Sequence, residues 1–292
     1  MNARLQGLED ENAAALASRN RRDDGVAGAV SVTSLESTGF AVELLGVPRV
    51  VRLSESGELA ALPLRLRRAW RGLALLALAP GRRVGREELV RTLWPEADAS
   101  RVRRNLPPTV YALRRALGAP AGHRAIDAAG KVYALSPRLR WRIDALDFDD
   151  AIETGRAAAR RGDAAAAERA WVLALELYRG PFLAGDDDPW VEEQRERFRR
   201  RRQELLRLLG DLRVREGDLE RALDTYRLSL AEESLQEDLH LALLRIYARQ
   251  GRRDLVRRHF DRFSRLLADE LGVEPGLEIT LEYHRLMAAA DR

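Results

Sequence analysis

The sequence predicts a mainly α-helical protein in which an N-terminal α+β part is followed by an all-α part. Strand-like runs occur only in the first half of the 292 residues, and amphipathic helical segments that begin alike recur in the second half. The net charge is only +4, yet residues 65–142 hold eighteen Arg or Lys against five Asp or Glu, and residues 143–292 are acidic on balance. A basic part beside an acidic part indicates that the first part binds a polyanion.

The composition argues against several other classes of protein. The chain has no Cys, and therefore neither a disulfide framework nor a thiolate metal site. It shows no signal peptide and no stretch of about 20 apolar residues, which predicts a cytoplasmic protein without a membrane partner. There is no phosphate-binding loop or dinucleotide-binding glycine pattern, and the four His have no metal-ligand spacing. The adjacent carboxylates Asp186, Asp187 and Asp188 are interpreted as a solvated loop cap. We therefore expect neither an enzyme nor a cofactor.

The first predicted elements are strands, which follow a flexible tail at residues 1–38. The tail mixes Ala, Asn, Asp, Ser and Gly without a period. "FAVELLGVPRVV" (40–51) predicts two strands joined by a Gly-Val-Pro turn, and "ALPL" (61–64) is also strand-like. Further along, "AIDAAGKVYALS" (125–136) alternates apolar residues around Gly130, as a hairpin does.

Three helical segments lie between these strands and the hairpin. "RLRRAWRGLALLALAPG" (65–81) has apolar residues at helical spacing and ends in Pro-Gly, and "GREELVRTLWPEA" (85–97) begins with acidic residues that suit the helix dipole. Three helices between an N-terminal sheet and a terminal hairpin describe a winged helix, which we assign to residues 39–142. In that arrangement the third helix enters the major groove of DNA and the hairpin reaches toward the adjacent minor groove.

The third segment, "SRVRRNLPPTVYALRRALG" (100–118), carries two prolines in an otherwise helical pattern. A Pro inside a helix costs roughly 3 kcal/mol, and the residue before a Pro is disfavoured in the α region. Near a helix start the same residue is harmless. We therefore predict that the regular helix starts at about Pro108 and that residues 100–106 form a separate turn or short helical piece.

The second half of the chain contains a repeat. Segments 160–178, 215–234 and 249–267 each begin with a basic residue, any residue and Gly, followed by an amphipathic helix. Gly217 and Gly251 lie 34 residues apart, which is the tetratricopeptide period, and "GPFLAGDDDPW" is an insertion between the first two units. These features predict a tetratricopeptide-like solenoid over residues 143–292, with a concave face for a partner.

At the level of motifs the chain resembles the SARP-type regulators. "ALLALAPGRRVGREELVRTLWPEAD", "ALRRALG", "WVEEQRERF" and "ADELGVEPGLEI" followed by "YHRLMA" occur in the order of that family, over about residues 40–290. The resemblance implies an OmpR-like winged helix followed by a bacterial transcriptional activator domain of tetratricopeptide repeats. It also implies a cytoplasmic transcription regulator, commonly an activator, that binds double-stranded promoter DNA, contacts RNA polymerase and often forms dimers. In that family the third helix is usually a single recognition helix, whereas the two prolines argue for a shorter one.

The candidate DNA-binding residues follow from this arrangement. Base-facing positions recur every third or fourth residue, and Pro108 and Ala112 among them offer only apolar contact, suited to a thymine methyl group. The predicted base contacts are Arg104, Asn105 and Thr109, the predicted phosphate contacts are Arg101, Arg103, Tyr111, Arg114 and Arg115, and Lys131 at the hairpin tip is predicted to enter the minor groove. The five Trp (Trp70, Trp94, Trp141, Trp171 and Trp190) are expected to pack in the core.

Two functions remain open at this level. The first is a sequence-specific transcription regulator of the activator type. The second is a protein-interaction scaffold whose winged helix has lost sequence-specific DNA binding, which the proline pair and Ala112 favour.

Overall fold

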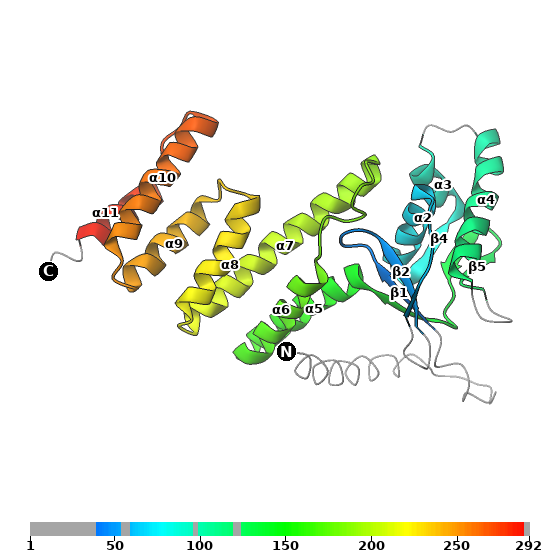
Figure 1. The fold of residues 1–292 in the computed structure, drawn as a ribbon, viewed down its shortest axis with the longest axis horizontal. Helices are drawn as coiled ribbons and strands as arrows, with labels where there is room; N and C mark the ends of the chain where they lie inside the picture. The colour runs from blue at the N-terminus through cyan, green and yellow to red at the C-terminus, as the bar shows by residue number, and fades with distance from the viewer. Residues whose placement is uncertain (1–38, 54–58, 96–98, 119–123, 289–292) are drawn as a thin grey trace. The chain divides into compact units, whose positions relative to one another are not determined.

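A computed structural model describes residues 39–53, 59–95, 99–118 and 124–288, with only the backbone of residues 59–60 and 99–104 (Figure 1). The predicted flexible tail at 1–38 lies outside these residues. Strands and short helices make up the N-terminal part of the described chain, and helices follow to residue 288, as the sequence predicts.

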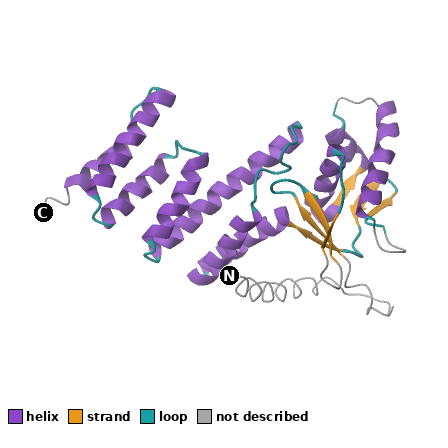
Figure 2. Cartoon of the chain, in the orientation of Figure 1, coloured by secondary structure: helices purple, strands orange, loops and turns teal. Residues whose placement is uncertain are grey.

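A four-stranded sheet opens the fold, in the order β3-β2-β1-β7. Strands are drawn orange in Figure 2. The strands β1 (Gly39–Glu43) and β2 (Arg49–Leu53) pair antiparallel and confirm the prediction from "FAVELLGVPRVV". The strand β3 (Leu59–Ala61) lies earlier than the predicted "ALPL" strand. The strand β7 (Arg140–Ile143) was not predicted, because its alternation of exposed and buried residues covers only four positions; it pairs parallel with β1.

The winged-helix elements follow in the predicted order. The helix α2 (Arg67–Leu78) leads into the short strand β4 (Arg83–Gly85) and the helix α3 (Arg86–Leu93). The hairpin of β5 (Ile126–Ala129) and β6 (Val132–Leu135) joins β4 in a sheet of order β4-β6-β5. The apolar residues at helical spacing in these two segments are buried: Trp70, Leu73, Leu76, Ala77, Leu89, Leu93 and Trp94.

The third helix, α4 (Ala99–Leu117), runs unbroken through Pro107 and Pro108. The prediction that a regular helix starts at about Pro108 is therefore wrong. The physical reason lies in the buried stripe, which has Leu106 on one side of the proline pair and Val110 and Leu113 on the other. Each fully buried residue of this size contributes about 1.5–3 kcal/mol. A single continuous stripe against the core thus offsets the cost of the prolines, whose own side chains are exposed.

The helical half consists of antiparallel pairs whose turns lie at the predicted glycines. Gly162, Gly217 and Gly251 have φ of 78°, 82° and 72°, a left-handed conformation that glycine adopts without strain. They separate the two helices of each pair, and a further helix closes the described chain. The helices are α5 (Asp144–Arg160), α6 (Ala164–Leu177), α7 (Pro189–Arg215), α8 (Leu219–Glu232), α9 (Glu237–Arg249), α10 (Arg253–Leu271) and α11 (Leu277–Ala288).

Two of these helix pairs each contain a close contact between a glycine and an aromatic ring. A Cβ on Gly155 of α5 would overlap the indole of Trp171 on α6, and a Cβ on Gly210 of α7 would overlap the ring of Tyr226 on α8. In both pairs the aromatic residue follows the glycine by sixteen positions. The glycines therefore bring the helices together around rings that are almost completely buried.

The apolar core divides at the junction of α7 and α8. One cluster runs from Phe40 on β1 through the winged-helix elements to Leu212 on α7, and a second runs from Ala222 on α8 to Ile279 on α11. The first helices of the repeat part thus share a core with the winged helix. The boundary predicted between residues 142 and 143 falls inside this core, at the end of β7, and as a domain boundary it stays a prediction.

Candidate nucleic-acid interface

The helix α4 has a buried face and an exposed face. Leu106, Val110, Leu113 and Leu117 are buried on one side. At 100° per residue the opposite side carries Pro108, Tyr111 and Arg115, and Pro107 lies on the flank next to them; all four are exposed, and Tyr111 keeps 65% of its surface in solvent. The free face of the predicted recognition helix is therefore built from two proline rings, a phenol and a guanidinium.

Two arginines attach the C-terminal half of α4 to the strands. The Nη2 of Arg52 on β2 donates to the carbonyl oxygen of Leu117 at 2.8 Å and also to that of Gly118. The Nε of Arg114 donates to the carbonyl oxygen of Ile126 on β5 at 3.0 Å. A cation at the last carbonyls of a helix also opposes the negative end of its dipole. Nothing in the sequence marked Arg52, since its partner lies 65 positions away.

The predicted base contacts lie on the edge of the exposed face or outside the described side chains. Asn105 and Thr109 are half-buried on the flank of α4, and the Thr109 hydroxyl donates to the Asn105 carbonyl at 2.9 Å. Ala112 lies on the same flank. Arg101, Arg103 and Arg104 belong to α4, but their side chains lie outside the described part of the structure.

The predicted phosphate contacts differ from one another in their surroundings. Tyr111 and Arg115 are exposed, whereas Arg114 is half-buried and bonded to β5. Lys131 lies at the turn of the β5–β6 hairpin with its side chain exposed, and its carbonyl accepts from the backbone N–H of Arg86 at 2.7 Å. That bond ties the hairpin tip to the start of α3.

Three cations near this interface lack the ion pairs that a run of arginines on α7 has. Arg115, Arg124 and Lys131 are exposed, and none of them forms an ion pair with another described residue. On α7, in contrast, a run of arginines is neutralised by Asp and Glu of its own and neighbouring helices: Arg197, Arg199, Arg200, Arg201 and Arg202. Arg115, Arg124 and Lys131 thus leave exposed positive charge on α4 and beside the hairpin.

The winged helix is fastened to the helical part by the segment between α6 and α7, residues 179–188, which we call the strap. The backbone N–H of Leu183 donates to the carbonyl of Leu44 at 2.8 Å, and that of Ala184 to the carbonyl of Gly46 at 2.9 Å. The insertion predicted between the first two repeat units thus pairs with the β1–β2 turn. The buried carboxylate of Asp144 reinforces the junction, because it accepts from the N–H groups of Leu44 and Leu45 at 2.7 and 3.1 Å.

The acidic cluster of the strap forms ion pairs with α2. Arg71 donates to Asp186 at 2.5 and 2.8 Å and to Asp188 at 2.5 Å, and all three side chains are at most 12% exposed. The interpretation of the cluster as a solvated loop cap holds for Asp187, which is 93% exposed, and is wrong for its two neighbours. Burial works to raise the pKa of Asp186, but the hydrogen bonds from Arg71 outweigh it and hold the pKa below its ordinary value.

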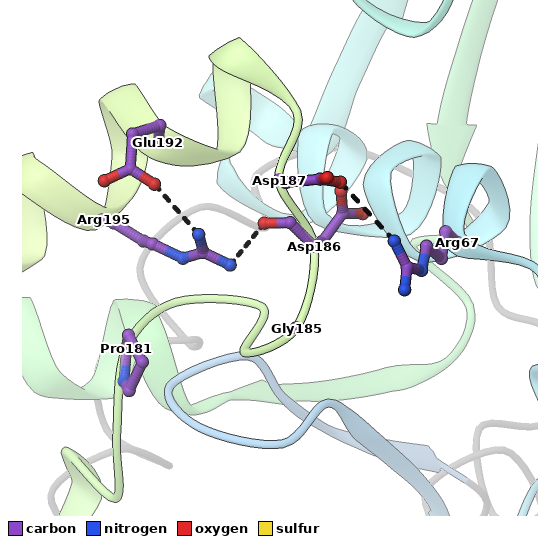
Figure 3. A pocket seen from close by; sticks show the side chains of 7 residues that line it. All are labelled: Arg67, Pro181, Gly185, Asp186, Asp187, Glu192 and Arg195. Atoms are coloured by element: carbon purple, nitrogen blue, oxygen red, sulfur yellow. Dashed lines mark hydrogen bonds and ion pairs between the residues drawn. The ribbon is translucent and has the colours of Figure 1, made fainter.

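Figure 3 shows a shallow pocket beside this cluster, lined by Arg67, Arg195, Glu192 and the strap. Arg195 donates to Glu192 at 2.9 Å and to carbonyl oxygens of the strap, and Arg67 lies 3.5 Å from Asp187. Because each cation there already has an anionic or carbonyl partner, the pocket serves to hold the strap rather than to attract a charged ligand.

A histidine pair was not visible in the sequence spacing. Nδ1 of His240 on α9 lies 2.9 Å from Nε2 of His259 on α10, and Nε2 of His240 lies 2.8 Å from the Ser234 carbonyl. That carbonyl requires a proton on Nε2 of His240, so Nδ1 accepts from His259. Burial lowers the pKa of both residues, for His259 to about 4. Within the described residues no group of three or more His, Asp or Glu is arranged to hold a metal ion.

The tryptophans pack as the sequence predicts. Trp70, Trp94, Trp141 and Trp171 are buried, and Trp190 lies edge-on to Phe182 of the strap, with ring centroids 6.0 Å apart. No helix of the described chain is long and apolar enough to cross a membrane.

Comparison with known proteins agrees with this architecture. Residues 143–287 match the bacterial transcriptional activator domain. The chain is 30% identical over 230 residues to the regulatory protein AfsR of Streptomyces coelicolor. The aligned residues cover 79% of this chain and 23% of that protein. It is 27% identical over 223 residues to the transcriptional regulatory protein MoaR1 of Mycobacterium tuberculosis, covering 74% of this chain and 70% of the relative. The chain thus spans about a quarter of the length of AfsR.

A solved structure shares the fold. It is that of Mycobacterium tuberculosis EmbR in complex with a low-affinity phosphopeptide, with a TM-score of 0.72 and 24% sequence identity, over 87% of this chain and 66% of that one. The order of a small sheet region, short helices and a helical array is therefore an arrangement that a known structure also adopts.

Proposed function

Because this chain belongs to the SARP-type transcriptional regulators, we propose that it regulates transcription by binding double-stranded promoter DNA through α4 and the β5–β6 hairpin. The helix would lie in the major groove and Lys131 would enter the adjacent minor groove. The observation that carries this proposal is a set of exposed cations, Arg115, Arg124 and Lys131, that form no ion pair with the described residues and lie beside an exposed helix face.

The residues of the interface have separate roles in this proposal. Arg101, Arg103, Tyr111 and Arg115 contact phosphates, which fixes the position of the protein on the duplex without selecting a sequence. Arg104, Asn105 and Thr109 contact base edges, and Pro108 and Ala112 offer apolar contact to a thymine methyl group. Arg114 remains a candidate phosphate contact, but its bond to β5 means that its replacement would also loosen the hairpin.

The salt dependence of binding tests the DNA interface. The logarithm of the association constant should fall linearly with the logarithm of salt concentration, with a slope of about −0.9 per phosphate contact. Arg115→Ala should reduce that slope by about one phosphate and weaken binding to all duplexes alike, whereas Arg104→Ala should change the preferred sequence. Arg200→Ala is the matched control, since Arg200 is exposed but paired with Glu196 on α7.

We propose that the helical repeats bind a protein partner, either RNA polymerase or a second protomer. A group of exposed apolar residues at the end of the described array supports a protein contact: Leu271, Val273, Leu277 and Leu281. Leu277→Ser with Leu281→Ser should preserve DNA affinity and lower promoter activation in a reconstituted transcription assay. Sedimentation of the variant and the unaltered protein separates the two partners, because only loss of a protomer contact would change the mass in solution.

The scaffold alternative makes the opposite prediction for DNA. If no duplex fragment binds at low salt, while the repeats still bind a protein, the winged helix serves as a structural part and the regulator mechanism proposed here is refuted.

A further inference from the structure

The interior of α4 lacks two consecutive backbone donors. In an α-helix the N–H of residue i donates to the carbonyl of residue i−4, and Pro has no N–H. Pro107 and Pro108 both lie inside the continuous helix. The carbonyl oxygens of Arg103 and Arg104 therefore have no donor at the position where the helix would normally supply one.

At 100° per residue, the carbonyl of Arg104 lies on the side of the helix that faces away from the core, and the carbonyl of Arg103 lies toward the edge of that side. Both prolines are exposed; Pro108 lies opposite the buried Leu106 beside Arg115, and Pro107 lies on the flank next to Tyr111. A proline ring also displaces the carbonyl one turn before it and opens the helix on its own side. Two adjacent acceptors are thus presented beyond the N-terminal side of the proline rings, where water or a ligand can supply the missing bonds.

Other groups on this face do not fill the role. Tyr111 lies one turn further toward the C-terminus, and the Thr109 hydroxyl on the flank already donates to the Asn105 carbonyl at 2.9 Å. The described part of the exposed face otherwise offers apolar proline rings and the cation of Arg115. The main-chain carbonyls are the acceptors that the proline pair creates.

We propose that these two carbonyl oxygens read bases directly, by accepting hydrogen bonds from exocyclic amino groups in the major groove; this inference rests on the proposed function. Adenine N6 and cytosine N4 are the donors there, whereas guanine O6 and thymine O4 are acceptors and would repel a carbonyl. Two neighbouring positions on one strand of the site are then restricted to adenine or cytosine. The prolines act as specificity-determining residues by freeing the backbone, without touching the bases through a polar side chain.

Selection from a random duplex library tests this reading. The full chain, the double variant Pro107→Ala/Pro108→Ala and the control Pro63→Ala are each used to select sites; Pro63 is an exposed proline between β3 and α2. Alanine restores both N–H groups and should leave the protein at least as helical by circular dichroism. We expect the unaltered chain and the control to share a motif with two adjacent adenine-or-cytosine positions, and the double variant to lose the restriction at those positions alone.

A second measurement separates carbonyl contacts from a change in helix shape. At each of the two positions adenine is replaced by purine, or cytosine by 2-pyrimidinone, which removes only the amino group. The unaltered chain should lose about tenfold in affinity per amino group, as for an unsatisfied hydrogen bond, and the double variant should lose less than twofold.

The outcomes distinguish this inference from the function on which it rests. If the unaltered chain selects a motif but the amino groups can be removed without loss, or the double variant keeps the same motif, carbonyl readout is wrong and the DNA-binding proposal stands. If the unaltered chain binds no duplex at low salt, both are wrong.

Discussion

Replacing Asp186 by Ala tests how the strap holds the winged helix. The substitution removes the carboxylate that accepts two hydrogen bonds from Arg71, at 2.5 and 2.8 Å, and one from the backbone N–H of Asp188 at 3.2 Å. The guanidinium of Arg71 is only 12% exposed, so water cannot fully replace the lost partner. Asp187→Ala is the matched control, since it removes the same charge one residue away from a side chain that is 93% exposed.

The expected magnitude follows from burial and from the remaining partner. Removing one member of a buried ion pair typically costs about 3–5 kcal/mol, because the other charge is left without compensation. Asp188 stays within 2.5 Å of Arg71 and compensates part of that loss. We therefore expect Asp186→Ala to lower the free energy of unfolding by about 2–3 kcal/mol. An exposed pair contributes about 0–1 kcal/mol, and Arg67 and Asp187 are 3.5 Å apart, so the control should change stability by less than about 0.5 kcal/mol.

Urea unfolding followed by Trp fluorescence measures both variants, and Trp190 reports directly on the strap because its backbone N–H donates to Asp188 at 3.1 Å. Amide hydrogen exchange should also rise in α2 and in the β1–β2 turn for Asp186→Ala, since these elements contact the strap. Equal stabilities for the two variants, or faster exchange confined to α8–α11, would refute the assignment of Asp186 as a buried anchor.

Three further predictions follow from the same contacts. Arg52→Ala should lower stability by about 1.5–3 kcal/mol, because a charged donor at the end of α4 is lost, and should weaken DNA binding; urea unfolding and a binding titration measure the two effects. Burial lowers the pKa of His259 from 6.5 to about 4, so this residue makes the stability of the wild type fall as the pH drops from about 6.5 to 4. Burial raises the pKa of Asp147 to about 6, so its carboxyl group makes the stability fall as the pH rises from about 4 to 6. His259→Gln and Asp147→Asn should therefore shift the pH dependence of the unfolding free energy in opposite directions, each by up to about 3.5 kcal/mol. Parallel curves for variant and wild type would contradict this. Gly155→Ala should destabilise the protein by roughly 1–3 kcal/mol although Ala favours helix, because its Cβ would overlap Trp171; a rise in Tm would count against that contact.

Local patterns predicted much of the architecture. The hairpin at Gly130, the helices before it and the glycine turns of the repeats all depend on residues within about four positions of one another, and the structure contains each of them. The interface could be predicted only in part. Tyr111, Arg115 and Lys131 are exposed and their DNA contacts stay a prediction, whereas the contact of Arg114 with β5 was not predicted.

The features that were missed depend on residues far apart in the chain. The strand β7 forms because β1, about a hundred positions earlier, supplies a pairing edge, and its own four residues carry too short a pattern to be recognised. Arg71 and Asp186 are 115 positions apart, so the sequence alone indicated a solvated cluster. In the fold, α2 packs against the cluster and Arg71 pairs with it. The two histidines likewise come together only when α9 and α10 pack.

By itself, the amino-acid order determined which segments of this protein are helical, where they turn and where positive charge is left in excess, because each of these depends on near neighbours. Tertiary packing decided the rest. It kept α4 continuous through two prolines, since Leu106, Val110 and Leu113 gain more from a single buried stripe than the missing backbone bonds lose. It also turned the insertion between repeat units into the strap that holds the winged helix, because burial converts carboxylates that would be hydrated in an open loop into partners that Arg71 requires.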